Sequence, residues 1–219
     1  MLKENPKVLM VMAHPDDEIL FGWPIFQDKS VEKNLIICSS DFNNPERQWC
    51  KYRKNSLIKI CEKENVPVMC LDYNSSFYRT PTRRPSNLRS GEPGDSQAPF
   101  RHMCDTIKRI IKENQDNYDY IFTHNPHGEY GHIDHKLLFE LVLKVSKKPV
   151  LITDINLPSN WSEKMDFTDK INMLYYNNKV KEGCIIDFEK YKEYEKVYID
   201  DGVWTWSREV PRECNLYII

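Results

Sequence analysis

Histidines and carboxylates gather in two short segments of this chain. The first segment, His-Pro-Asp-Asp-Glu, runs from His14 to Glu18, and the second runs from His124 to His135. Together they hold five of the six histidines, since only His102 lies elsewhere. Two histidines and one carboxylate are a common ligand set of catalytic zinc sites, in which one position stays open for water. The two segments therefore predict a metal site.

The spacing within each segment suggests a division of roles. Asp16 and Asp17 are adjacent, so they leave the turn in different directions, and one can hold a metal while the other faces the water bound to it. Such a base is needed because zinc lowers the pKa of water to about 7, but the proton must still be taken up. His132 and His135 are three residues apart at the expected start of a helix, so they share a face.

Each segment has a simpler interpretation when it is taken alone. His-Pro-Asp-Asp is also typical of a strand-to-helix turn with capping carboxylates. A His-x-x-His pair is also found on ordinary helix surfaces. The combination favours the metal site, because both segments follow an apolar run that we interpret as a strand, Val8 to Ala13 and Tyr118 to Thr123. The carboxyl ends of parallel strands are where open α/β sheets bind ligands.

Strands and helices are expected to alternate along the first two thirds of the chain. Further strands are expected at 35–39, 67–71 and 150–154, and helices at 19–26, 45–64, 100–114 and 137–145. Gly22 and Pro24 are expected to end or kink the first of these helices. Alternation of this kind predicts βαβ crossovers and a parallel sheet, and hence an α/β fold class.

Two regions are less regular. Residues 74–99 are interpreted as a long loop, and its arginines fit either a lid over an anionic substrate or a solvated loop; they are Arg79, Arg83, Arg84 and Arg89. Beyond Asn156, strands or one helix with strands are expected at 171–176, 184–188 and 194–199. Trp204 and Trp206 fit either packing or the lining of a pocket.

Length, charge and cysteine usage narrow the class of protein. A chain of 219 residues suits a single domain over 1–219, with 155–219 as its C-terminal portion. The formal net charge of -2 provides no overall attraction to nucleic acid or to an anionic membrane. We expect a cytoplasmic protein, because no signal peptide or membrane span is apparent. The seven scattered cysteines include no Cys-x-x-Cys pair, which argues against disulfides and a thiolate zinc site.

The two segments resemble the PIG-L/LmbE-like family of zinc-dependent deacetylases, which remove acetyl from N-acetylglucosamine-type sugars. The motifs that carry this resemblance are Ala13-His14-Pro15-Asp16-Asp17-Glu18, His124-Asn125-Pro126 and Gly128-Glu129-Tyr130-Gly131-His132-Ile133-Asp134-His135. The order of expected elements is also similar. The resemblance implies a Rossmann-like three-layer fold, with a mostly parallel sheet and helices on both faces.

The resemblance also implies a role for each matching residue. The implied metal ligands are His14, Asp17 and His135. Asp16 would be the general base, and His132 would stabilise the oxyanion or act as an acid with support from Asp134. The expected metal is Zn²⁺, although Fe²⁺ or Co²⁺ suits the same ligands.

A further match is Tyr52-Arg53, where family members place a substrate-binding arginine. The family often has Glu three residues after this arginine, whereas Ser56 stands there in this chain. Arg53 is therefore either a contact to the sugar or an exposed charge on a helix.

The expected reaction is hydrolysis of the acetamide of an N-acetyl sugar or sugar conjugate. Phosphorylated and nucleotide-linked sugars are among the candidates, because arginine side chains match phosphate oxygens. Two alternatives use the same residues: a metal-dependent amidase acting on a non-sugar conjugate, and a non-catalytic sugar-binding relative.

Overall fold

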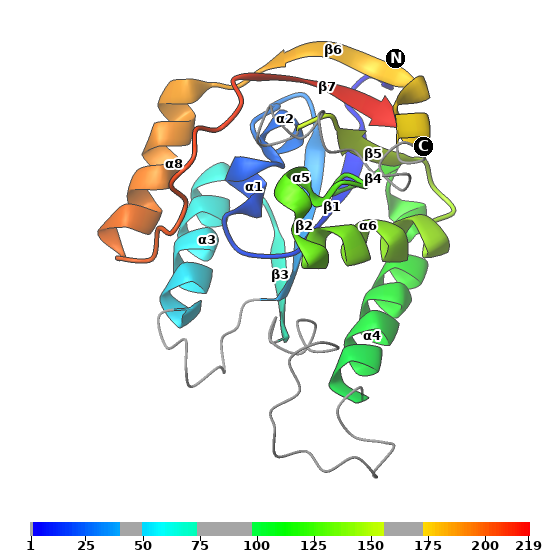
Figure 1. Cartoon of the computed structure of the whole chain (residues 1–219), viewed down its shortest axis with the longest axis horizontal. Helices are drawn as coiled ribbons and strands as arrows, with labels where there is room; N and C mark the ends of the chain where they lie inside the picture. Colours follow the sequence, from blue (N-terminus) through cyan, green and yellow to red (C-terminus); the bar gives the residue numbers. More distant parts are fainter. Residues whose placement is uncertain (1, 40–49, 74–97, 156–172) are drawn as a thin grey trace.

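A mixed sheet runs through the molecule (Figure 1). The computed structural model describes residues 2–39, 50–73, 98–155 and 173–219. Within this part, seven strands are arranged in the order β3-β2-β1-β4-β5-β7-β6. They are β1 Lys7–Met12, β2 Glu32–Ser39, β3 Val68–Tyr73, β4 Tyr120–Thr123, β5 Val150–Thr153, β6 Lys179–Ile185 and β7 Glu213–Ile218. Strands β1 to β5 pair in parallel, whereas β7 pairs antiparallel with both β5 and β6.

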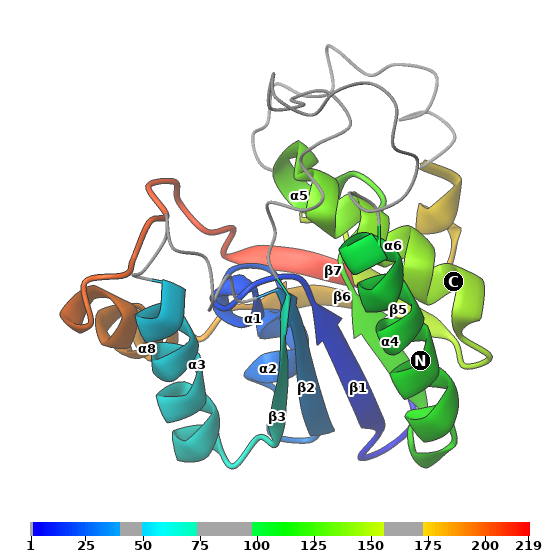
Figure 2. The same cartoon turned by 90° about the horizontal axis from the view of Figure 1, so that it is seen from below.

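Helices cover both faces of the sheet (Figure 2). One face carries α1 Asp17–Leu20, α2 Trp23–Phe26, α3 Cys50–Glu64 and α8 Phe188–Asp200. The other face carries α4 Ala98–Asn114 and α6 Ile133–Val145. The short helices α5 Gly128–Gly131, η3 Gln115–Asn117 and η5 Met173–Asn177 complete the described part. The expected α/β fold, with a mostly parallel sheet between two layers of helices, is confirmed.

Strand β1 is apolar from Val8 to Met12 because both of its faces are buried there. Val8, Met10 and Met12 belong to the hydrophobic core on the α1 and α3 side. Leu9 and Val11 belong to the core on the α4 and α6 side. Successive side chains of a strand point to opposite faces, so a central parallel strand shows a continuous apolar run and no alternation.

The helix expected at 19–26 is divided into α1 and α2 at Gly22. Glycine is unfavourable in the interior of a helix. Pro24, in the first turn of α2, has no backbone N–H and cannot continue the helical hydrogen bonds from α1. A side chain at Gly22 would also meet its surroundings, because its Cβ would lie 2.9 Å from Met10 Cε and 3.0 Å from the carbonyl oxygen of Glu18.

Replacing Gly22 with Ala is therefore expected to lower the free energy of unfolding by about 1–3 kcal/mol, the usual cost of forcing a methyl group into a packed core. Chemical denaturation of the variant and of the wild type measures this difference. An unchanged free energy of unfolding would mean that α1 and Met10 move aside without cost.

Other boundaries also differ from expectation. The fourth strand begins at Tyr120 and not at Tyr118, because the backbone N–H of Tyr118 still donates to the Gln115 carbonyl of the preceding 3-10 helix, 3.1 Å away. In the last third, where strands or one helix with strands are expected, residues 194–199 lie within the helix α8, whereas 173–176 lie in a 3-10 helix. Strand β7 was not expected from the sequence. The helix start expected at 45 and the arginines of the expected loop lie outside the described residues.

The pairing of β1 with β4 positions the two chemical segments. Their register sets Val11 opposite Thr123, so the residues that follow the two strands leave the sheet side by side. In the described part of the chain, no helix combines the length and apolar character needed to cross a membrane.

Candidate metal centre and active site

The structure brings both segments to the same edge of the sheet. The backbone N–H of Ala13 donates a hydrogen bond to Nε2 of His124, 3.0 Å away, which joins the ends of β1 and β4 directly. Two overlapping sets of side chains place donor atoms within 4.8 Å of one another: His14 with His132 and His135, and Asp17 with His124 and His135. Hydrogen bonds to these side chains indicate which atoms are free to bind a metal.

The three ligands implied by the resemblance form an equal-sided triangle. His14 Nδ1, Asp17 Oδ2 and His135 Nε2 are each 3.4 Å from the other two. A tetrahedral zinc with ligand distances of about 2.0–2.1 Å has ligands about 3.3–3.4 Å apart. The spacing of these donor atoms therefore fits a tetrahedral ion.

Buried carboxylates orient both histidines of this triangle. His14 Nε2 lies 2.9 Å from Asp134 Oδ2, and His135 Nδ1 lies 2.6 Å from Glu129 Oε2. Each carboxylate accepts the ring N–H of its histidine, so a neutral ring would carry its lone pair on the other nitrogen, which faces the triangle. This carboxylate–histidine arrangement is typical of metal sites, where it sets the tautomer and raises the basicity of the ligand.

The other two histidines direct different atoms toward the site. Nε2 of His124 accepts the N–H of Ala13, so its lone pair is already used, and its Nδ1 donates to Glu129 Oε2 at 3.1 Å. Nδ1 of His132 accepts the backbone N–H of Asp134 at 3.2 Å and caps α6. The proton of neutral His132 is therefore on Nε2. In these tautomers His124 and His132 do not serve as ligands through the nitrogens that face the triangle.

Charges in the site are set by burial and by close neighbours. Burial opposes ionisation of Asp17, but His135 and His124 beside it hold the pKa of Asp17 well below its usual range. Burial, together with the nearby His135 and His14, lowers the pKa of His132 to about 3. Asp17 is thus an anion suited to a cation, and His132 is a neutral N–H donor near pH 7.

Asp16 pairs with Arg53 of α3 through its carboxylate. Its backbone has φ 95°, a left-handed conformation that is uncommon for residues other than glycine. Burial raises the pKa of Asp16 to about 6, although the Arg53 guanidinium acts in the opposite direction. The side chain of Arg53 is only 17 % exposed. Of the two interpretations of Arg53, that of an exposed helix charge is wrong.

The structure changes the contact expected for Asp134. Its side chain lies 2.9 Å from Nε2 of His14 but 3.9 Å from Nδ1 of His132. Asp134 therefore orients His14 through its carboxylate and contacts His132 through its backbone N–H. His127 does not belong to either set of donor atoms. Its ring stacks on Tyr176, with ring centroids 5.9 Å apart.

Glu129 is a functional candidate that sequence reasoning missed. It is 1 % exposed, accepts hydrogen bonds from His124 and His135, and accepts the N–H of Asn125 at 3.0 Å. Its backbone has φ 54°. Unusual backbone conformations in non-glycine residues cluster at functional sites. The signal in the sequence is one of two carboxylates, Glu129 and Asp134, within the histidine-rich segment, and it does not reveal which histidine Glu129 contacts.

Replacing Glu129 with Gln is expected to weaken metal binding by about 10- to 100-fold, the usual effect of losing an orienting partner. Gln has one acceptor oxygen and one donor group, whereas both oxygens of Glu129 accept hydrogen bonds. Competition with a chelating dye measures the affinity. Glu113→Gln, on the exposed side of α4, is the control. Wild-type affinity in Glu129→Gln would exclude the orienting role.

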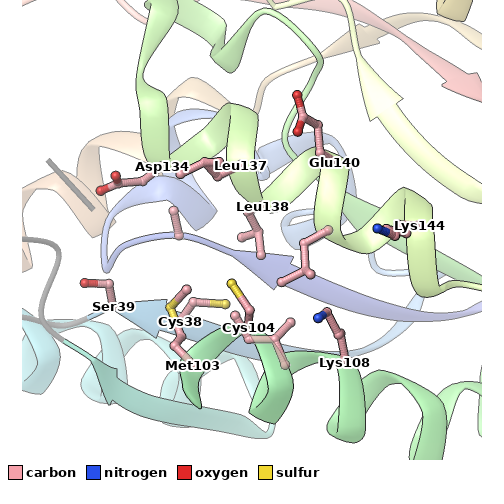
Figure 3. A pocket seen from close by; sticks show the side chains of 13 residues that line it. Cys38, Ser39, Met103, Cys104, Lys108, Asp134, Leu137, Leu138, Glu140 and Lys144 are labelled. Atoms are coloured by element: carbon pink, nitrogen blue, oxygen red, sulfur yellow. The ribbon is translucent and has the colours of Figure 1, made fainter. Parts of the chain in front are cut away.

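An aromatic wall and a cavity border the site. Tyr130 packs against His132 and His135, with centroids 5.5 and 5.6 Å apart, and against Trp206 at 5.2 Å. A cavity of about 220 Å³ extends from Asp134 between α4 and α6 (Figure 3). Its wall is mainly aliphatic or sulfur-containing, with lysines at the far end, and includes Met103, Cys104, Ile107, Leu137, Leu141, Lys108 and Lys144.

The fold and site together define an α/β protein with a candidate metal centre at the carboxyl edge of its parallel strands. The model of the PIG-L family, described as GlcNAc-PI de-N-acetylase, matches residues 9–146. Since the match covers more than half of the chain, this protein belongs to the PIG-L family of deacetylases.

Solved structures share the fold at low sequence identity. A deacetylase of teicoplanin biosynthesis in complex with teicoplanin is 13 % identical, with a TM-score of 0.60 and 97 % of each chain covered. A zinc-inhibited form of the teicoplanin deacetylase Orf2 is 14 % identical, with a TM-score of 0.59 and again 97 % of each chain covered.

A curated relative is similar in sequence. Uncharacterized protein L374 of Acanthamoeba polyphaga mimivirus is 25 % identical over 152 residues, which is 63 % of this chain and 57 % of that protein. The chain thus spans little more than half the length of this relative.

Proposed function

We propose that this protein is a metal-dependent hydrolase that removes the acetyl group from an N-acetylated amino sugar or sugar conjugate. The observation that carries the proposal is the donor triangle of His14, Asp17 and His135, with Asp16 beside it, in a chain of the PIG-L family. A carboxylate next to a metal-binding set is the arrangement that hydrolysis by an activated water requires.

The ion would be held by His14, Asp17 and His135, and zinc suits two nitrogens and one carboxylate oxygen in this spacing. When bound, it supplies a Lewis acid that polarises the amide carbonyl and lowers the pKa of water. Fe²⁺ or Co²⁺ suits the same donors. Three protein donors would leave one position of a four-coordinate ion for water or substrate.

The protein's own groups would move the protons. Asp16 accepts a proton as the water oxygen forms its bond to the acetyl carbon. The Nε2–H of neutral His132 donates a hydrogen bond to the oxyanion that develops on the carbonyl oxygen. The C–N bond then breaks, the leaving nitrogen takes up a proton, and the products are acetate and a free amine. Arg53, held against Asp16, is the candidate contact to substrate.

The surroundings support a sugar conjugate as substrate. Tyr130 lies beside His132 and His135, and Trp206 packs on Tyr130. Such aromatic rings offer large apolar faces for the C–H groups of a sugar. The mainly apolar cavity beyond Asp134 provides room for an attached group.

The test is acetate release by metal-loaded protein from a panel of N-acetyl compounds. The panel contains N-acetyl sugars that are free, phosphorylated, nucleotide-linked or carried on an alkyl group, together with N-acetyl conjugates without a sugar. Release from a sugar compound is expected. Release only from non-sugar compounds would favour the amidase, and binding of sugars without any release would favour the non-catalytic relative.

A further inference from the structure

Helix α8 lies outside the residues matched by the family model, yet its last turn reaches the active-site loop. Tyr198 is fully buried, and its hydroxyl donates a 2.7 Å hydrogen bond to Oε1 of Glu18, which is also fully buried. Helices α8 and α3 lie side by side on the same face of the sheet (Figures 1 and 2). The C-terminal part of the chain thus contacts the His-Pro-Asp-Asp-Glu segment through a specific polar pair.

Glu18 also binds the backbone of Asp16. Its second oxygen, Oε2, accepts the backbone N–H of Asp16 at 2.8 Å. The peptide held in this way belongs to the residue with φ 95°, a conformation that costs free energy unless its surroundings maintain it. The direction of the Asp16 carboxylate depends on this backbone conformation, so Glu18 and Tyr198 together hold the carboxylate where it meets Arg53.

A second contact runs from α8 to the helix that carries Arg53. Asp201, the C-cap of α8, accepts a 2.7 Å hydrogen bond from the hydroxyl of Ser56. It also pairs with Lys59 Nζ, at 2.7 and 2.8 Å from its two oxygens. Arg53 lies one turn before Ser56 on α3. Ser56, which stands where the resemblance led us to expect a glutamate, therefore binds a carboxylate supplied by α8.

We propose that the C-terminal end of α8 is a positioning element for the active site, which sets Asp16 through the Tyr198–Glu18 pair and Arg53 through the Asp201–Ser56 contact. Its kinetic consequence rests on the proposed function. Neither Tyr198 nor Asp201 contacts the donor triangle in the structure. Loss of either should therefore alter turnover or substrate binding while the metal stays bound.

Tyr198→Phe tests the first contact. We expect kcat to fall by about 10-fold, at the low end of the 10- to 100-fold typical of outer hydrogen-bond partners, with unchanged KM and metal content. Tyr191→Phe is the matched control, since Tyr191 is also a buried tyrosine of α8, but its hydroxyl bonds to Glu195 of the same helix.

Asp201→Ala tests the second contact. We expect KM to rise by at least about 5-fold, the effect of losing the Ser56 hydrogen bond, with the Lys59 pair lost as well, while kcat changes less. Asp200→Ala is the control, because the adjacent Asp200 pairs only locally, with Lys196 of the same helix at 2.7 Å. Both pairs of variants keep the helix and differ in which element the polar group contacts.

Hydrogen exchange supplies a measurement that needs no activity. Exchange of the amide of Asp16 should quicken in Tyr198→Phe and stay unchanged in Tyr191→Phe, because only Tyr198 supports Glu18. If the wild type releases no acetate from any compound, the proposed function fails while this measurement still tests the positioning. Unchanged exchange, or equal kinetic changes in Tyr198→Phe and Tyr191→Phe, would overturn the proposal.

Discussion

Replacing Asp16 with Asn is expected to lower kcat by about 10²- to 10⁴-fold, the usual contribution of a general base, while the metal stays bound. Asn lacks the anionic oxygen that takes the proton from water. It also tolerates a left-handed backbone, so the φ of 95° at this position does not prevent folding. Turnover, metal content and thermal stability of the variant measure the three parts of this prediction.

Asp17→Asn is the companion variant, because the adjacent carboxylate belongs to the donor triangle. It should lose metal as well as turnover. If Asp16→Asn keeps wild-type turnover, Asp16 is not the base. If it loses its metal, the two neighbouring carboxylates have the opposite roles.

Replacing His14 with Ala is expected to weaken metal binding by more than the roughly 10- to 100-fold that loss of an orienting partner costs, and to abolish turnover. His14 Nδ1 is one corner of the triangle, with 3.4 Å to each of the other donors. His135→Ala should behave in the same way. Metal analysis after dialysis, with kinetics at saturating metal, measures both effects.

His132→Ala tests whether His132 is a metal ligand, as in the set with His14 and His135, or lies outside the donor triangle. His132 lies near His14 and His135, but its Nδ1 is occupied by the N–H of Asp134. The variant should therefore keep its metal and lose part of its turnover, because an oxyanion donor is missing. If His132→Ala loses its metal while His14→Ala keeps it, His132 is a metal ligand and His14 is not.

Much of the fold follows from local pattern. The apolar run from Val8 onward predicts a buried strand, and Tyr120 to Thr123 forms the neighbouring strand in the structure. Both patterns depend on residues close together in the sequence, and the parallel arrangement follows from the alternation of strands with helices. Strand β7 is different, since it is placed by antiparallel pairing with β5 and β6.

The contacts of the site depend on residues far apart in the chain. In the sequence Asp134 follows His132 by two residues, but the fold places its carboxylate against His14. From the sequence Arg53 is either a substrate contact or an exposed helix charge, and only the packing of α3 against the loop pairs it with Asp16. Such pairs form only when helices and loops pack against one another. The spacing of residues along one helix or strand does not predict them.

The residue types themselves carry the class of chemistry, because nitrogen and carboxylate donors after two parallel strands suit a metal at the sheet edge. Which ring nitrogen of His14 and of His124 carries the proton was decided by the tertiary structure, because the partners of both rings lie far away in the sequence. Glu129 and Asp134 each take one ring N–H, while Ala13 and Asp134 occupy the lone pairs of His124 and His132. A tautomer is a property of a hydrogen-bonded neighbourhood, and that neighbourhood exists only once the chain has folded.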